Sequence, residues 1–126
     1  MIKPVIFVCS ACAFSKTQRE YQGQRGGAHL LAALLQMQSQ QPHSAPCKIE
    51  PVGCLSACNR ACAIALSAPQ KNALMFGDLH PLESASAILQ LAAQYHSSPD
   101  GIVPRQQRPS LLQKGILARI PPLPSR

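Results

Sequence analysis

A chain of 126 residues is long enough to bury a core without disulfide bonds and short enough to form one domain. Hydrophobic residues make up 46% of it but aromatic residues only 4%, so the core must be aliphatic, and the formal net charge is +7. Six cysteines are too few for a disulfide-dense secreted scaffold, and neither an export signal nor a membrane-length apolar run is present. We therefore expect a cytoplasmic protein without a membrane segment, in which paired cysteines are metal ligands or redox thiols.

The first part of the chain predicts a strand, a helix and a second strand. Residues 3–8 form a short segment with several β-branched side chains, which favours a strand. A polar loop over 9–27 ends in two glycines. Leucines then recur at three- and four-residue spacing in 28–40 and predict a helix with one apolar face. Residues 47–52 are expected to form the second strand.

Two more strands and a second helix are predicted next. Residues 53–61 carry Cys54 and Cys58 and are expected to be a loop with a helical turn. Residues 62–66 form an apolar strand, and the short turn before 73–76 favours an antiparallel hairpin. The second helix is expected over 81–96, with a proline at its first position.

The order βαββα predicts an α/β fold: a thioredoxin-like layer with a four-stranded mixed sheet and helices packed on it. The first crossover, from the first strand through the long helix to the second, is expected to join parallel strands in the right-handed sense. We expect this domain to span residues 1–100 and an extended tail to span 101–126.

The predicted tail is rich in proline and basic. It has five basic residues and no acid, and we expect a helical turn around 110–113. It lacks a dense Lys/Arg run and any aromatic residue to stack on bases, which disfavours nucleic acid as a partner. An acidic protein partner, or a role in solubility alone, is favoured instead. The basic residues are Arg105, Arg108, Lys114, Arg119 and Arg126.

Two separated cysteine pairs each follow a predicted strand. Cys9 and Cys12 follow the first strand, and Cys54 and Cys58 follow the second. In a thioredoxin-like layer these two loops lie at the same end of the sheet, so the pairs can converge. Four thiolates suit either Zn²⁺ in a closed tetrahedral site or an iron–sulfur cluster.

The remaining chemistry-bearing residues give weaker signals. Cys62 lies four residues past Cys58 and is a further candidate ligand, although its apolar strand favours a core role; Cys47 has no near partner and is expected to be structural. Five acidic residues leave little material for acid–base catalysis, so we expect a carrier rather than an enzyme. Four histidines have no metal-ligand spacing and are expected at the surface or in caps: His29, His43, His80 and His96.

A resemblance to known proteins adds to these patterns. The segment G-C-L-S-A-C before an apolar strand resembles the second cysteine pair of thioredoxin-like [2Fe-2S] ferredoxins and of the small cluster-bearing subunit of NADH–quinone oxidoreductases. The whole chain resembles a bacterial family of uncharacterised, predicted metal-binding proteins with that fold. The matching pieces are C-S-A-C, R-G-G, C-L-S-A-C-N-R-A-C, F-G-D-L-H-P, S-P-D-G-I-V-P and R-P-S-L-L-Q-K-G-I-L-A-R-I-P-P-L-P.

The resemblance implies that Cys9, Cys12, Cys54 and Cys58 hold the metal group, and it implies a redox or metal role beside cobalamin metabolism. In one respect the chain departs from the ferredoxins, which usually separate their first two cysteines more widely than C-x-x-C. Zinc or another divalent metal therefore remains an alternative to the cluster.

Three functions therefore stay open. The first is a [2Fe-2S] electron-transfer protein, and the second is a binding protein or carrier for zinc, cobalt or a similar divalent metal. The third is a thiol–disulfide oxidoreductase using Cys9 and Cys12, although C-S-A-C holds neither an aromatic residue nor a proline. We expect a redox or metal-transfer protein as partner, acidic in character, and a homodimer as the candidate assembly.

Overall fold

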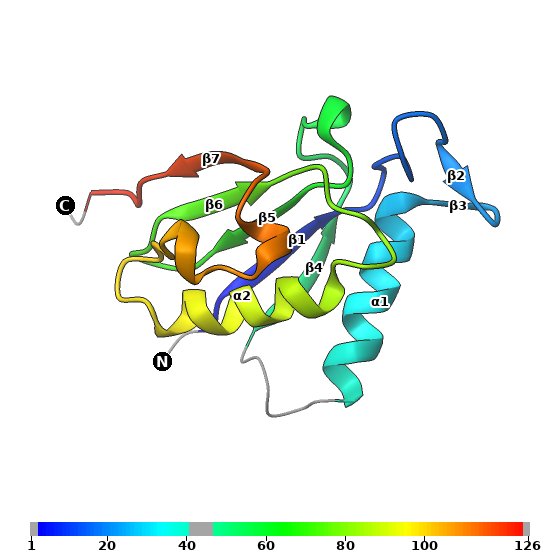
Figure 1. The fold of residues 1–126 in the computed structure, drawn as a ribbon. Helices are drawn as coiled ribbons and strands as arrows, with labels where there is room; N and C mark the ends of the chain where they lie inside the picture. Colours follow the sequence, from blue (N-terminus) through cyan, green and yellow to red (C-terminus); the bar gives the residue numbers. More distant parts are fainter. Residues whose placement is uncertain (1–2, 41–46, 125–126) are drawn as a thin grey trace.

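The computed structural model describes residues 3–40 and 47–124, which form a mixed five-stranded sheet with helices packed on it (Figure 1). The strand order is β4–β1–β5–β6–β7. β1 pairs in parallel with β4, and all other neighbours are antiparallel. The strands are β1 (Val5–Cys9), β4 (Lys48–Val52), β5 (Ile64–Ser67), β6 (Ala73–Phe76) and β7 (Ile116–Ile120).

The two long helices contact each other and lie against one face of the sheet (Figure 1). They are α1 (Gly26–Gln40) and α2 (Ala85–Ser97). The strand, helix, strand, hairpin and helix order that the sequence predicts is confirmed, as is the parallel pairing of the first two long strands. Within the described part of the chain, no helix combines the length and apolar character that a bilayer crossing requires.

An aliphatic core fills the space between the sheet and the helices. Ile6 and Val8 of β1 are fully buried, because alternate residues of a strand point to the same face. Leu30 and Leu34 carry the buried stripe of α1, whereas Leu35 is 47% exposed and does not belong to it. The hydroxyl of Tyr95, in the buried face of α2, donates a hydrogen bond of 2.6 Å to the Asn72 carbonyl.

The predicted sheet is one strand short, because β7 lies in the stretch that we expected to be an extended tail. β7 pairs with β6 only and is an edge strand with a mostly exposed surface. Alternation of apolar and polar residues is weak in such a strand, and prolines follow it directly. Before β7, the helical turns η2 (Arg105–Gln107) and η3 (Ser110–Leu112) run alongside α2, and η3 confirms the predicted turn (Figure 1).

Two further details differ from the sequence-based expectations. The polar loop after β1 contains a small hairpin, β2 (Glu20–Tyr21) and β3 (Gln24–Arg25), around Gln22 and Gly23, which both have positive φ. A two-residue turn with positive φ at both positions suits a tight hairpin. The second helix begins at Ala85 rather than Pro81, because residues 81–83 form a separate turn.

Candidate metal centre

The two cysteine pairs follow the carboxyl ends of the neighbouring parallel strands β1 and β4. Cys9, the last residue of β1, is the register partner of Val52, the last residue of β4. Both the backbone N–H and the hydroxyl of Ser10 donate to the Val52 carbonyl, at 2.9 and 3.0 Å. Cys54 comes two residues later. The expectation that both loops lie at one end of the sheet is thereby confirmed.

The first pair, Cys9 and Cys12, lies in a tight buried turn. Both side chains are at most 5% exposed, and the Cys12 backbone N–H donates to the Cys9 carbonyl. Burial, together with the Cys9 thiol, raises the pKa of Cys12 to about 12. Without a metal ion or cluster, the Cys12 thiol is therefore protonated at neutral pH.

Two glycines bring the start of α1 directly against this turn. A Cβ at Gly27 would overlap the Cys9 carbonyl oxygen, and a Cβ at Gly26 would overlap the Ala13 carbonyl oxygen. The Gly27 N–H donates to the Cys12 carbonyl at 3.1 Å. The first turn of a helix carries partial positive charge, so this approach favours negative charge on the neighbouring thiols.

The second pair, Cys54 and Cys58, is exposed on the other loop. The Ser56 backbone N–H donates to the Cys54 sulfur at 3.1 Å. This bond is the main cause of a lowered pKa of Cys54, with smaller contributions from the Ser56 hydroxyl and from Cys58. Ser56 itself has a positive φ of 59°, a left-handed conformation that turns the chain sharply within this loop. Cys58 begins the helical turn η1 (Cys58–Arg60), as the sequence predicts.

Contacts with the end of β6 hold the second loop in place. The Arg60 guanidinium donates to the Asp78 carboxylate at 2.7 Å, and the Asp78 N–H donates to the Arg60 carbonyl. The hydrogen bond from Arg60 lowers the pKa of Asp78. Gly77 lets the chains approach, since a Cβ there would lie 2.7 Å from the Arg60 carbonyl oxygen and 2.8 Å from Leu117 of β7. The edge strand β7 thus borders the second cysteine loop.

The two remaining cysteines have different surroundings. Cys62 is fully buried, and its thiol donates to the Ala13 carbonyl at 3.5 Å. Burial and the nearby Cys9 thiol raise the pKa of Cys62 to about 12. Cys62 therefore lies beside the first pair, and it is buried whereas Cys58 is exposed. Cys47 is buried next to Gln38, whose amide donates to its carbonyl at 2.9 Å.

The candidate ligands are arranged as two pairs on adjoining loops. Over residues 3–40 and 47–124, no three side chains of His, Cys, Asp or Glu are close enough together to hold a metal ion. The donor chemistry nevertheless fits a soft metal or an iron–sulfur cluster, since all four candidate ligands are thiols and one sulfur accepts a backbone N–H.

A cluster of two aromatic and two histidine side chains, close in sequence to the first pair at Phe14, was not predicted from the sequence. The rings of Phe14 and Tyr21 stack at 4.7 Å, and His29 and His80 each lie edge-on to Phe14 at 5.7 and 5.9 Å. His80 Nδ1 also accepts from the Leu82 N–H at 3.1 Å, within the turn over 81–83 that precedes α2, while His43 lies outside the described residues. Aromatic residues are scarce in this chain, so two of them close together between Cys12 and α1 were the available signal.

These environments predict the order in which the thiols react. We expect iodoacetamide at neutral pH to label Cys54 first in the reduced, metal-free protein, because it is exposed and its pKa is lowered. Cys12 and Cys62 should react last, since their pKa values of about 12 leave almost no thiolate. Peptide mass spectrometry over time measures the order, with urea-unfolded protein as the control in which the differences disappear. Labelling of Cys12 or Cys62 before Cys54 would contradict the prediction.

The sheet, its helices and the cysteine-bearing strand ends define a thioredoxin-like α/β protein. A structure titled as a thioredoxin-like [2Fe-2S] ferredoxin from Aquifex aeolicus matches with a TM-score of 0.52 at 16% identity, covering 82% of this chain and 100% of that one. A second structure, of the wild-type protein with the same description and organism, matches with a TM-score of 0.54 at 17% identity, covering 75% and 88%. At such identities the likeness establishes the fold.

The chain belongs to the family described as "Protein of unknown function (DUF1636)", which matches residues 6–122. A search of the curated proteins gives no match. The resemblance to a family with the thioredoxin-like ferredoxin fold is thus confirmed.

Proposed function

We propose that this protein is a small electron carrier that holds a [2Fe-2S] cluster on Cys9, Cys12, Cys54 and Cys58. The observation that carries the proposal is the parallel pairing of β1 with β4. A cysteine-bearing loop follows the carboxyl end of each strand, and the Ser10 hydroxyl of the first loop donates to the Val52 carbonyl at the start of the second. The two neighbouring structures are titled as [2Fe-2S] ferredoxins, which supports the same reading.

The surroundings of the cysteines suit this role. A bound cluster would supply one-electron exchange. The Ser56 N–H and the start of α1 would stabilise thiolate charge on the second and first pairs respectively. Cys54 and Cys58 are exposed, so the second loop would bring one side of the cluster close to a redox partner.

The net charge of +7 favours an acidic protein as that partner, since complementary charge speeds association. We also propose a cytoplasmic location, supported by six free cysteines. A role beside cobalamin metabolism is supported only by the sequence resemblance.

One sample tests the proposal. Protein purified anaerobically, or reconstituted with iron and sulfide, is expected to be reddish-brown and to contain iron and acid-labile sulfide in equal amounts. A visible spectrum and analysis for iron, sulfide and zinc on the same sample measure this. Protein that stays colourless after reconstitution would contradict it.

A divalent metal carrier is the second candidate, favoured by the C-x-x-C spacing of Cys9 and Cys12. It predicts one tightly bound zinc or cobalt ion and no acid-labile sulfide in the same analysis. The dithiol oxidoreductase has less support, because both thiols of this pair are buried and the pKa of Cys12 is raised. Insulin reduction that survives Cys54→Ser but is lost in Cys9→Ser would favour it.

A further inference from the structure

Three arginines line one cleft at the β6–β7 edge of the sheet. The cleft has a volume of about 160 Å³ and is bounded by β6, β7 and the segment that follows α2. Arg105 and Arg108 come from that segment, and Arg119 comes from β7. Leu74 and Phe76 of β6 supply an apolar floor. None of the residues that line the cleft is a cysteine, so it is separate from the proposed cluster site.

The register of the edge strand turns Arg119 toward this floor. Arg119 pairs with Leu74, and Ile116 pairs with Phe76, with a register shift between these two pairs. Residues three apart in a regular strand point to opposite faces, but an extra residue restores them to the same face. Arg119 and Ile116 therefore both border the cleft.

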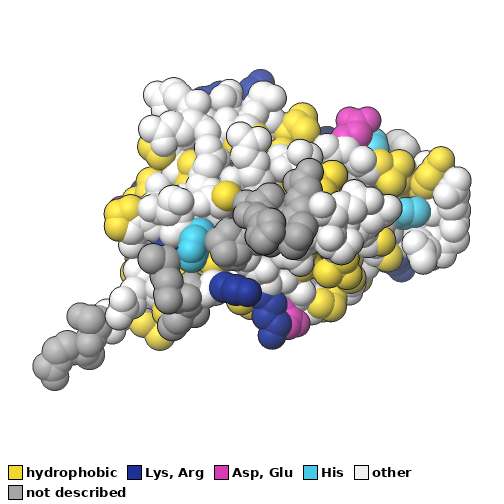
Figure 2. All heavy atoms as spheres, turned by 90° about the horizontal axis from the view of Figure 1, so that it is seen from below, with side chains coloured by type: hydrophobic (Ala, Val, Ile, Leu, Met, Phe, Trp, Pro, Cys, Tyr) yellow, Lys and Arg dark blue, Asp and Glu magenta, His cyan; other side chains and the backbone are white. Residues whose placement is uncertain are grey.

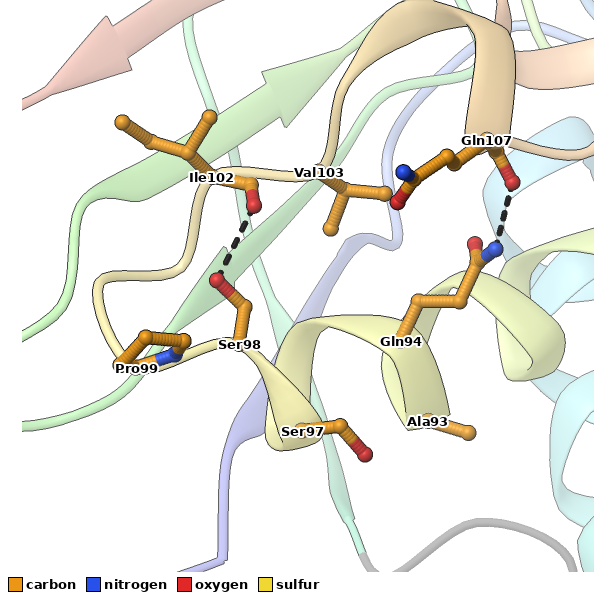
Figure 3. A pocket seen from close by; sticks show the side chains of 8 residues that line it. All are labelled: Ala93, Gln94, Ser97, Ser98, Pro99, Ile102, Val103 and Gln107. Atoms are coloured by element: carbon orange, nitrogen blue, oxygen red, sulfur yellow. Dashed lines mark hydrogen bonds between the residues drawn. The ribbon is translucent and has the colours of Figure 1, made fainter.

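Hydrogen bonds fix the opposite wall to α2 and to Ser98, the residue that follows it. The Ser98 hydroxyl donates to the Ile102 carbonyl at 3.0 Å, and the Gln94 amide donates to the Gln107 carbonyl (Figure 3). These bonds cross a separate hollow of about 540 Å³, whose lining residues carry no charge. Because the 102–107 segment is held at both ends, the cleft on its other side is formed before any ligand binds.

The arginines of the cleft have no acidic partner among the residues that the structure describes. Three of the five acidic residues form ion pairs elsewhere, with Arg25, Lys48 and Arg60. Asp100 lies near enough to Arg119 to feel its charge, but its carboxylate accepts from Ser98 and the Ile102 N–H. The cleft therefore has an excess of positive charge.

Arg108 is the most constrained of the three. Its guanidinium lies over the Phe76 ring at 5.7 Å and donates to the Leu112 carbonyl at 3.1 Å. Its Nε is buried and has no hydrogen-bond partner within the described chain. Burial, and then the charge of Arg105, lowers the pKa of Arg108. A buried donor without a partner among like charges is a costly arrangement that an anion would relieve.

We propose that this cleft binds a small organic anion, with its carboxylate or phosphate group on Arg105, Arg108 and Arg119 and its apolar body against Phe76 and Leu74. The volume sets the size of the ligand: sites for drug-sized molecules measure roughly 300–1,000 Å³, whereas a cavity of about 150 Å³ accepts benzene. The cleft therefore suits a single ring or a short branched chain, and it excludes a nucleotide.

Calorimetric titration of the full-length protein at constant ionic strength tests the proposal. Benzoate and phenyl phosphate are the probes for the two head groups, and benzyl alcohol and inorganic phosphate lack the charge and the apolar body respectively. We expect saturable binding at one site for benzoate, phenyl phosphate or both, and at least tenfold weaker binding of the two incomplete probes. No saturable binding of either full probe would overturn the proposal, as would equal affinity for inorganic phosphate.

Variants distinguish the contribution of the cleft arginines to binding from the effect of the protein's net charge. Arg105 and Arg119 are exposed, so Arg105→Gln and Arg119→Gln should fold normally, and each is expected to weaken binding at least tenfold. Lys114→Gln removes the same charge from the same segment at an exposed residue outside the cleft, and it should change affinity less than twofold. Equal weakening in all three variants would overturn the assignment.

Discussion

The Cys54→Ser protein is expected to lose most of the visible absorption that reconstituted wild-type protein shows. In the proposed site the thiolate of Cys54 is a cluster ligand, whereas a serine hydroxyl is a harder donor that is protonated at neutral pH. Cys58→Ser, Cys9→Ser and Cys12→Ser should have the same effect, because a [2Fe-2S] cluster needs four ligands. Visible spectra with iron and sulfide analysis, on samples reconstituted in parallel, measure the loss.

The two other cysteines are the matched controls. Cys47→Ser and Cys62→Ser should keep the spectrum, since Cys47 lies next to Gln38 and the Cys62 thiol is directed at the Ala13 carbonyl, a bond that a serine hydroxyl can also make. Cys62 is the alternative candidate ligand, and it lies near enough to Cys9 for the Cys9 thiol to raise its pKa. Loss of the spectrum in Cys62→Ser with retention in Cys12→Ser would assign Cys62 as a ligand in place of Cys12.

Local sequence patterns predict most of this fold because its long elements are regular. The leucine spacing of α1 and the β-branched run of β1 reflect burial on one face, which periodicity records directly. β7 was missed because an edge strand buries little, and its pairing with β6 depends on contacts far apart in sequence. The β2–β3 hairpin was not predicted because strands of two residues are too short to show a periodic pattern.

The candidate site, like the fold, has features that local sequence patterns predict and features that they do not. That both cysteine pairs follow strands is a local feature, and their common end of the sheet follows from the parallel crossover. The position of Cys62 could not be predicted, because it depends on β5 running antiparallel to β1 and so bringing its start beside the Cys9 turn. The arginine cleft depends on a register shift, which no local pattern records.

Gly27→Ala tests the packing of α1 against the first cysteine turn, and two effects of opposite sign compete there. Alanine favours a helix over glycine by about 1 kcal/mol. The new Cβ, however, would overlap the Cys9 carbonyl oxygen and lie 2.8 Å from the Ser10 carbonyl carbon, and both are backbone atoms that cannot rotate away. Overpacking of this kind costs about 1–3 kcal/mol or more. We expect a net loss of about 1–2 kcal/mol in the free energy of unfolding, measured by urea titration with an unchanged m-value.

Gly53→Ala is the matched control, because Gly53 also lies next to a candidate ligand, Cys54, but has open space around it and no positive φ. It should leave the free energy of unfolding within about 0.5 kcal/mol of wild type, or raise it slightly by restricting the unfolded chain. A Gly27→Ala protein as stable as Gly53→Ala would mean that the Cys9 turn can move away from the helix. A turn that moves so easily could not hold Cys9 and Cys12 at fixed positions, and the contact between α1 and the first pair would then have no positioning role.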